Sequence, residues 1–189
     1  MKRIFLGITA LASAVSMATT SCSPSENVMP SSENSQASAS LMSRVNPGND
    51  GTTYEPCDAL SSEVASSLKV NIGSQEDAAA ATGQTARGCR WKLTDNRRWI
   101  ISQIVGNSTS LSDYKASQAD LKWRTDIIAN GRTVAISEVN AATCSAHVQS
   151  QRSTVSTIAQ FGSPQAPPID EICNRAIAFT KATIDKMPP

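Results

Sequence analysis

Four cysteines are spread so widely along the chain that their pairing constrains its fold more than any other sequence feature. They are Cys57, Cys89, Cys144 and Cys173. Because they form no CxxC pair and have no neighbouring histidine, zinc-binding and thioredoxin-like interpretations are poorly supported, and disulfides are the better interpretation. Four cysteines allow three pairings, and the one that joins sequence neighbours closes loops of about 30 residues, each contributing roughly 3 to 4 kcal/mol. The sequence therefore predicts a domain stabilised by two disulfides.

The N-terminal segment has the pattern of a secretory signal peptide. A short basic stretch, Met1–Arg3, is followed by an almost uninterrupted run of apolar and small residues, Ile4–Val15. This run is too short for a membrane-spanning helix, which needs about 20 apolar residues. We therefore expect residues 1–21 to be a signal peptide that takes the rest of the chain into an oxidising compartment outside the cytoplasm.

Small residues lead from this run to a fifth cysteine, Cys22, in an order that resembles a lipobox. There a bacterial signal peptidase cuts directly before a cysteine whose sulfur has been diacylated. Thr19 stands where the pattern prefers Leu, whereas Ser21 is acceptable before the cysteine. Two or more acyl chains, such as palmitate, would anchor the protein stably, since each buried methylene contributes about 0.8 kcal/mol. We expect lipid-modified Cys22 at the outer face of the cell membrane; the alternative is ordinary cleavage and a secreted protein.

The segment after Cys22 is dominated by Ser, Asn and Ala and cannot bury a core. We expect residues 22–53 to be the lipidated cysteine and a disordered Ser-rich tether, and residues 54–189 to be one α+β lipoprotein domain. Removing the signal leaves 15 Lys and Arg against 16 Asp and Glu, a net charge of −1. A charge so near zero argues against a nucleic-acid partner.

Apolar periodicity predicts a helix near each end of the domain and another between them. Apolar residues recur every four positions over 58–69, which indicates a short amphipathic helix. Residues 111–119 also have helical character, and Ala78–Ala81 is expected to form a helical turn. The clearest helix follows a Pro-Pro pair, because an apolar stripe over 169–184 has i, i+3, i+4, i+7 spacing.

Six segments rich in β-branched or alternating residues are expected to be strands. They cover 89–93, 98–105, 123–129, 132–137, 144–150 and 153–160. The pair Asn130–Gly131 separates two of them and favours a two-residue type I′ hairpin turn, because both positions need positive φ. The sequence predicts an α+β fold, a single antiparallel sheet covered on one face by an N-terminal and a C-terminal helix. Pairing the neighbouring cysteines would tie each of these helices to a strand.

The order and context of the cysteines resemble a known family. Pro56–Leu60 (PCDAL) opens the first helix, Cys89–Trp91 follows in a strand, Cys144 opens an alternating strand, and Cys173 lies on the terminal helix. Over roughly Glu55–Pro188 this pattern resembles the actinobacterial envelope lipoproteins known as domain of unknown function three-five-five-eight. The resemblance implies a lipid-anchored extracytoplasmic domain with two disulfides, and it brings neither an activity nor catalytic residues.

The sequence offers little support for an enzyme. His147 is the only histidine, and strand alternation places it opposite Cys144, Ala146 and Val148, on a face that we expect to be exposed to water. No GxSxG, SxxK, GxGxxG or P-loop motif occurs, so we expect no cofactor and no metal site. An envelope hydrolase would need a Ser beside His147, or convergent carboxylates in a cleft, assembled only in the fold.

Tryptophans and cations are the candidates for binding. Trp99 and Trp123 would be stacking platforms if exposed, although core packing is the commoner role. Arg97 and Arg98 would meet lipid headgroups or anionic wall polymer, although such cations are more often a solvated face. We therefore expect a non-enzymatic binding or accessory module of the cell envelope, whose partner is a protein, a lipid or a wall component bound through the sheet. A purely structural surface domain is a further alternative.

Overall fold

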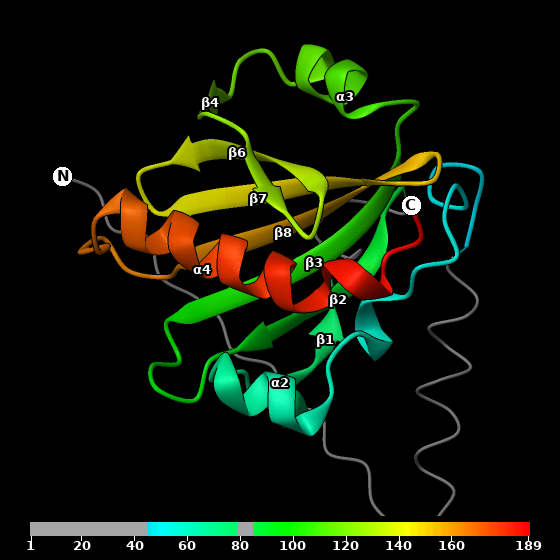
Figure 1. The fold of residues 1–189 in the computed structure, drawn as a ribbon. Helices are drawn as coiled ribbons and strands as arrows, with labels where there is room; N and C mark the ends of the chain where they lie inside the picture. Colours follow the sequence, from blue (N-terminus) through cyan, green and yellow to red (C-terminus); the bar gives the residue numbers. More distant parts are fainter. Residues whose placement is uncertain (1–44, 79–84) are drawn as a thin grey trace, which may run out of the picture.

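The computed structural model describes residues 45–78 and 85–189, which form one antiparallel sheet with helices packed around it (Figure 1). The described strands are β1 Glu76–Asp77, β2 Arg87–Lys92, β3 Trp99–Asn107, β4 Lys122–Trp123, β5 Ile127–Ala129, β6 Arg132–Asn140, β7 Thr143–Ser150 and β8 Ser153–Phe161. Their order is β1-β2-β3-β8-β7-β6-β4, and β5 also pairs with β6. The expected signal peptide, Cys22, most of the tether and the turn at 79–81 lie outside the described residues.

The described helices are three α-helices and three short 3₁₀ helices. The α-helices are α2 Ser62–Ser67, α3 Leu111–Ser117 and α4 Ile169–Thr183, and the 3₁₀ helices are η1 Pro56–Asp58, η2 Ile72–Ser74 and η4 Ile184–Lys186. None of the helices in the described ranges is long and apolar enough to cross a membrane.

Two of the tight hairpins in the described sheet turn through residues with positive φ. Asn130 (φ 49°) and Gly131 (φ 75°) join β5 to β6, which confirms the type I′ turn. Gln151 (φ 52°) turns the chain between β7 and β8. These two turns fix the register of the β5–β6 pair and of the β7–β8 pair.

Helix α4 crosses the front of the sheet and packs on β7 and β8 (Figure 1). Its acidic first turn and basic last turn match the helix dipole, as expected. Its buried side is the predicted stripe, which includes Ile172, Cys173 and Ala176, and it also buries Phe179. The disulfide Cys144–Cys173 joins this side to β7, with 5.0 Å between the Cα atoms.

The N-terminal helix is shorter than the sequence predicts. The expected helix over 58–69 is divided into η1 and α2, because Ser61 is extended and its side chain accepts a hydrogen bond from Val64 N, capping α2. Cys57 therefore lies in η1, and the disulfide Cys57–Cys89 ties this 3₁₀ helix to β2, not the α-helix itself.

The prediction that His147 is exposed is wrong, because the centre of the sheet is covered on both faces. Cys144 and Ala146 face α4, and His147, on the opposite face, is only 2% exposed. The chain between β3 and β6 folds back over that face, where Tyr114 of α3 and Trp123 of β4 contact the imidazole ring at 4.9 and 5.4 Å between ring centroids. Strand alternation alone does not reveal this second cover.

Candidate functional site

A solvent-open groove of about 290 Å³ lies between α2, the β2–β3 loop and α4. Its floor is apolar and belongs to the buried core: Val70, Leu93, Ile101 and Phe179. Its rim is polar, with charged side chains of both signs: Lys69, Asp95, Glu171 and Arg175. We name this feature the α2–α4 groove.

Local backbone contacts place the two sides of the α2–α4 groove. Lys69 has a left-handed backbone (φ 57°) that ends α2 and turns the chain toward the sheet. Its carbonyl accepts a hydrogen bond from Thr94 N at 2.7 Å, and Val70 forms an isolated antiparallel bridge with Leu93. On the other side, the Phe179 ring of α4 packs on Trp91, 5.6 Å between centroids. The floor is therefore rigidly connected to the core.

Arg175 is the less exposed of the two cations on the rim. Its guanidinium lies over the Trp99 ring, 4.1 Å from the ring centroid, and its side chain is 26% exposed. One guanidinium nitrogen, Nη2, lies 3.6 Å from Asp95 Oδ2 and 3.5 Å from Glu171 Oε1. Lys69 Nζ also lies 3.5 Å from the same Asp95 oxygen. Stacking on an aromatic face holds the cation in place without using its hydrogen-bond donors.

The structure does not gather the four binding candidates of the sequence into one site. Trp99 is 3% exposed and packs edge-on against Phe161, so it supports Arg175 and is not an open platform. Trp123 is half-buried near the other edge of the sheet, beside His147, with Lys115 Nζ 5.2 Å from its ring centroid.

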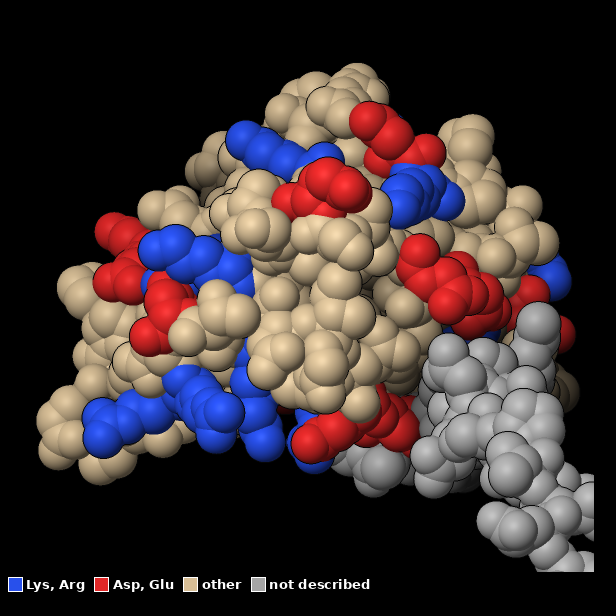
Figure 2. Space-filling view, turned by 90° about the horizontal axis from the view of Figure 1, so that it is seen from below, with Lys and Arg blue, Asp and Glu red and all other residues tan. Residues whose placement is uncertain are grey.

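Arg97 and Arg98 are exposed in the β2–β3 loop. Neither makes an ion pair with another described residue. Lys and Arg side chains gather at the lower left of Figure 2, beside a wide area with neither sign of charge. Binding by these two arginines stays a prediction.

Two serines lie beside His147, as an envelope hydrolase would require. Ser137 Oγ is 2.9 Å from Nε2, and Ser156 Oγ is 2.8 Å from Nδ1. Burial, with a smaller contribution from Lys115, lowers the pKa of His147 to about 3. The ring is therefore neutral, donating to one hydroxyl and accepting from the other. All three side chains are buried, and both ring nitrogens are occupied by hydroxyls, so within the described part of the chain this cluster has neither substrate access nor an orienting carboxylate.

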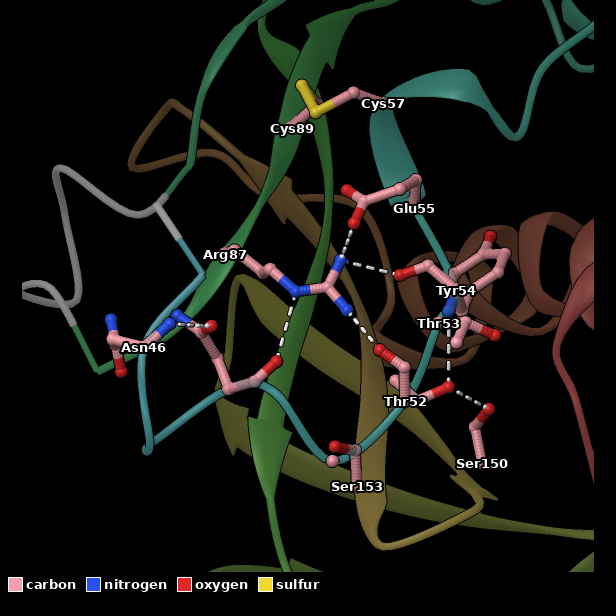
Figure 3. A network of polar contacts seen from close by, with 12 residues as sticks. Asn46, Thr52, Thr53, Tyr54, Glu55, Cys57, Arg87, Cys89, Ser150 and Ser153 are labelled. Carbon is pink, nitrogen blue, oxygen red and sulfur yellow. Dashed lines mark hydrogen bonds and ion pairs between the residues drawn. A yellow bond between two sulfur atoms is a disulfide. The ribbon is translucent and has the colours of Figure 1, made fainter. Parts of the chain in front are cut away.

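A second polar cluster surrounds Arg87 of β2, where the N-terminal segment joins the sheet (Figure 3). The buried guanidinium donates to the carbonyls of Asn49, Thr52 and Tyr54 and pairs with Glu55. Nearby, the Tyr54 hydroxyl donates to Gln103 Oε1, and burial raises the pKa of this tyrosine. These contacts satisfy buried backbone groups, which indicates a structural role.

Sequence reasoning missed both the groove and the Arg87 cluster. Arg87 lies two residues before Cys89, so strand alternation puts both on the inward face. This spacing could have predicted that Arg87 is buried. The groove gives no such signal, because its walls come from segments that are distant in sequence. Among the described residues, no group of three or more His, Cys, Asp or Glu side chains is placed to hold a metal ion.

Comparison with known families gives one match. A family model described as "Protein of unknown function (DUF3558)" matches residues 17–186. This range contains every described strand, both disulfides and the whole lining of the groove. No curated protein and no solved structure matches the chain.

Proposed function

This chain belongs to the DUF3558 family of proteins of unknown function, and we propose that it is a non-enzymatic binding module of the cell envelope. The α2–α4 groove holds an apolar anchor residue of a partner protein. The observation that carries the proposal is a solvent-open groove whose apolar floor belongs to the core and whose rim is charged. Protein interfaces concentrate their affinity in such pockets, which a bulky side chain fills while a polar rim excludes water.

Size and charge favour a protein partner over the other envelope components. At about 290 Å³ the groove lies at the small end of the range for binding pockets, about 300 to 1,000 Å³. Its rim carries two cations and two anions. An anionic wall polymer would favour a surplus of cations, whereas the polar rim of a protein interface commonly has both signs.

The anchor suits this role, with lipid on Cys22 and the Ser-rich segment as tether. Asn107 ends β3, and its N–H donates to Gly48 O at 2.9 Å, close to where the tether would join the domain. Asp95 of the groove lies just before the other end of β3. Nine strand residues span roughly 27 Å. The groove would therefore open at the end of the sheet away from the tether, where a partner has access.

Two alternatives are less well supported. A purely structural domain predicts no cleft, and the groove argues against it. An envelope hydrolase has a serine pair beside His147 in its favour, but neither hydroxyl is accessible.

Site-specific photo-crosslinking in native envelope tests the proposal. A photoreactive amino acid replaces Ser67, which lines the groove and is exposed, and in a matched control it replaces the exposed Ser117 of α3. We expect a defined envelope protein to crosslink from Ser67 only. Ala178→Trp, which fills the groove from α4, should abolish that product. A Ser67 product that persists with Ala178→Trp, or that also forms from Ser117, would rule out the groove as the binding site.

A further inference from the structure

We infer that the α2–α4 groove receives the C-terminal residue of its partner protein, with that residue's bulky apolar side chain on the floor and its carboxylate on Arg175. This inference rests on the proposed function and adds the chemistry that the groove would recognise. It depends on three observations: Arg175 has hydrogen-bond donors without acceptors, these donors lie beside the apolar floor, and the ion pairs of Arg175 with neighbouring carboxylates are weak.

The donors of Arg175 are held in place but not used. Its only ion pairs with described residues are those of Nη2 with Asp95 and Glu171, at 3.6 and 3.5 Å, which exceed ordinary hydrogen-bond lengths. Nε and Nη1 have no acceptor among the described residues. The buried Trp99 ring supports the guanidinium from one side, 4.1 Å from the ring centroid. A guanidinium binds a carboxylate bidentately through Nη2 together with either Nε or Nη1, so an incoming carboxylate uses one free donor and replaces the two long contacts of Nη2.

Arg175 also stands next to the apolar floor. Phe179 follows it by one helical turn on α4, so both side chains face the same side of the helix and both line the groove. A ligand that contacts both must carry a negative charge close to an apolar group. The C-terminal residue of a polypeptide has this property, because its side chain and its carboxylate are attached to the same carbon.

The two resident carboxylates are weak competitors. Glu171 is 50% exposed and precedes Arg175 by one turn, and exposed pairs of this kind contribute little. Asp95 keeps Lys69 as a second partner when Arg175 binds another anion. An incoming carboxylate therefore exchanges two long contacts for a short bidentate pair.

Titration of the full-length protein with three small probes, followed by the side-chain Nε–Hε NMR signal of Arg175, tests the inference. The probes are N-acetylphenylalanine, its amide, which lacks the charge, and acetate, which lacks the apolar group. We expect the acid to bind about tenfold more tightly than the amide and acetate to show no saturable shift. Glu171→Gln should tighten binding of the acid but not of the amide, because it removes only the competing carboxylate.

Two variants separate the carboxylate contact from general damage, with the backbone amide of Ala178 as the reporter. Arg175→Gln should lower the affinity for the acid to that for the amide while leaving the amide bound, which shows that the groove is intact. Arg152→Gln, in the exposed β7–β8 turn, should change neither affinity. Equal affinities of acid and amide in the unmodified protein, or no binding of any probe, overturn the inference. The crosslinking from Ser67 decides the proposed function independently.

Discussion

His147 and Arg87 are both ionisable side chains that the fold removes from water, and they respond to burial in different ways. His147 loses its charge and shares its two nitrogens between Ser137 and Ser156. The Arg87 guanidinium is instead surrounded by carbonyl oxygens and Glu55, which accept its hydrogen bonds. Both solutions leave the buried polar groups paired.

The neutral state of His147 makes the protein less stable in mild acid. Burial lowers its pKa from 6.5 to about 3. Between these values the unfolded chain takes up a proton that the folded chain does not, so the free energy of unfolding falls as the pH falls. From pH 7 to pH 5 this one residue should lower it by about 2 kcal/mol. His147→Gln keeps a donor and an acceptor but does not titrate.

Chemical denaturation at pH 7, 6 and 5 measures this effect as the difference between the unmodified protein and His147→Gln. Carboxylates titrate alike in both proteins, so their contributions cancel in the difference. If the free energy of unfolding changes equally with pH in the two proteins, the folded state also accepts the proton on His147.

At the scale of elements, the segment 46–55 has no regular secondary structure and is nevertheless fixed to the sheet by side chains. Arg87 binds three of its carbonyls (Figure 3), and Asn107 Oδ1 accepts from Gly51 N at 2.8 Å. A Cβ at Gly51 would lie 2.7 Å from the carbonyl oxygen of Arg152, so this segment approaches the β7–β8 turn too closely for a larger residue. The segment 46–55 is thus held against the sheet at the point where the tether would begin.

Removing the Arg87 guanidinium should release the segment 46–55 from the sheet and lower the stability of the whole domain. Arg87→Met retains most of the apolar stem but leaves three buried carbonyls without donors, and we expect the free energy of unfolding to fall by about 3 to 5 kcal/mol. The matched control Arg97→Met, at an exposed position, should change it by less than about 0.5 kcal/mol. Urea unfolding of both variants checks this, and similar midpoints would show that solvent replaces the lost hydrogen bonds.

The elements that could be predicted from the sequence are those whose conformation depends on residues close in sequence. The Asn130–Gly131 turn and the stripe of α4 depend on neighbouring residues, and the structure confirms them. The start of α2 depends on competition between a Ser61 cap and the preceding η1, which periodicity does not resolve. The second cover over His147 depends on where the β3–β6 connection folds back, which no local pattern encodes.

The candidate site was beyond prediction for the same reason. Trp99 was a candidate stacking platform if exposed, with core packing the commoner role, and the structure buries it with the Arg175 guanidinium over its ring. The two residues are distant in sequence and meet only because α4 crosses the sheet. The floor likewise combines Ile101 of β3 and Phe179 of α4 with two residues outside the strands and α-helices, Leu93 directly after β2 and Val70 after α2. Sequence patterns predict which residues lie on a strand or helix face. They do not predict the groove, because it forms only when segments distant in sequence pack together.

At the scale of the whole molecule, the proposed arrangement has a lipid at one end, a Ser-rich tether, and a domain whose groove lies at its far end. A Ser-rich tether of about 20 residues has a root-mean-square span of roughly 25 Å, comparable to the length of β3. A partner protein in the same membrane would then be within reach of the groove. Tethering also raises the effective concentration of such a partner, so modest affinity in the groove would be sufficient.

The anchor itself is tested by Cys22→Ala. Alanine has no sulfur to be acylated. The proposal assumes that the lipid on Cys22 supplies all of the stable membrane affinity, so this variant removes the anchor. We expect the variant to appear in the culture medium while the unmodified protein fractionates with membranes, measured by immunoblotting of both fractions. The Cys57–Cys89 disulfide lies in the folded domain and should form in both proteins, so oxidation of this pair serves as a control for correct export and folding. If Cys22→Ala stays with the membranes at the level of the unmodified protein, the lipid on Cys22 is not what holds the domain there.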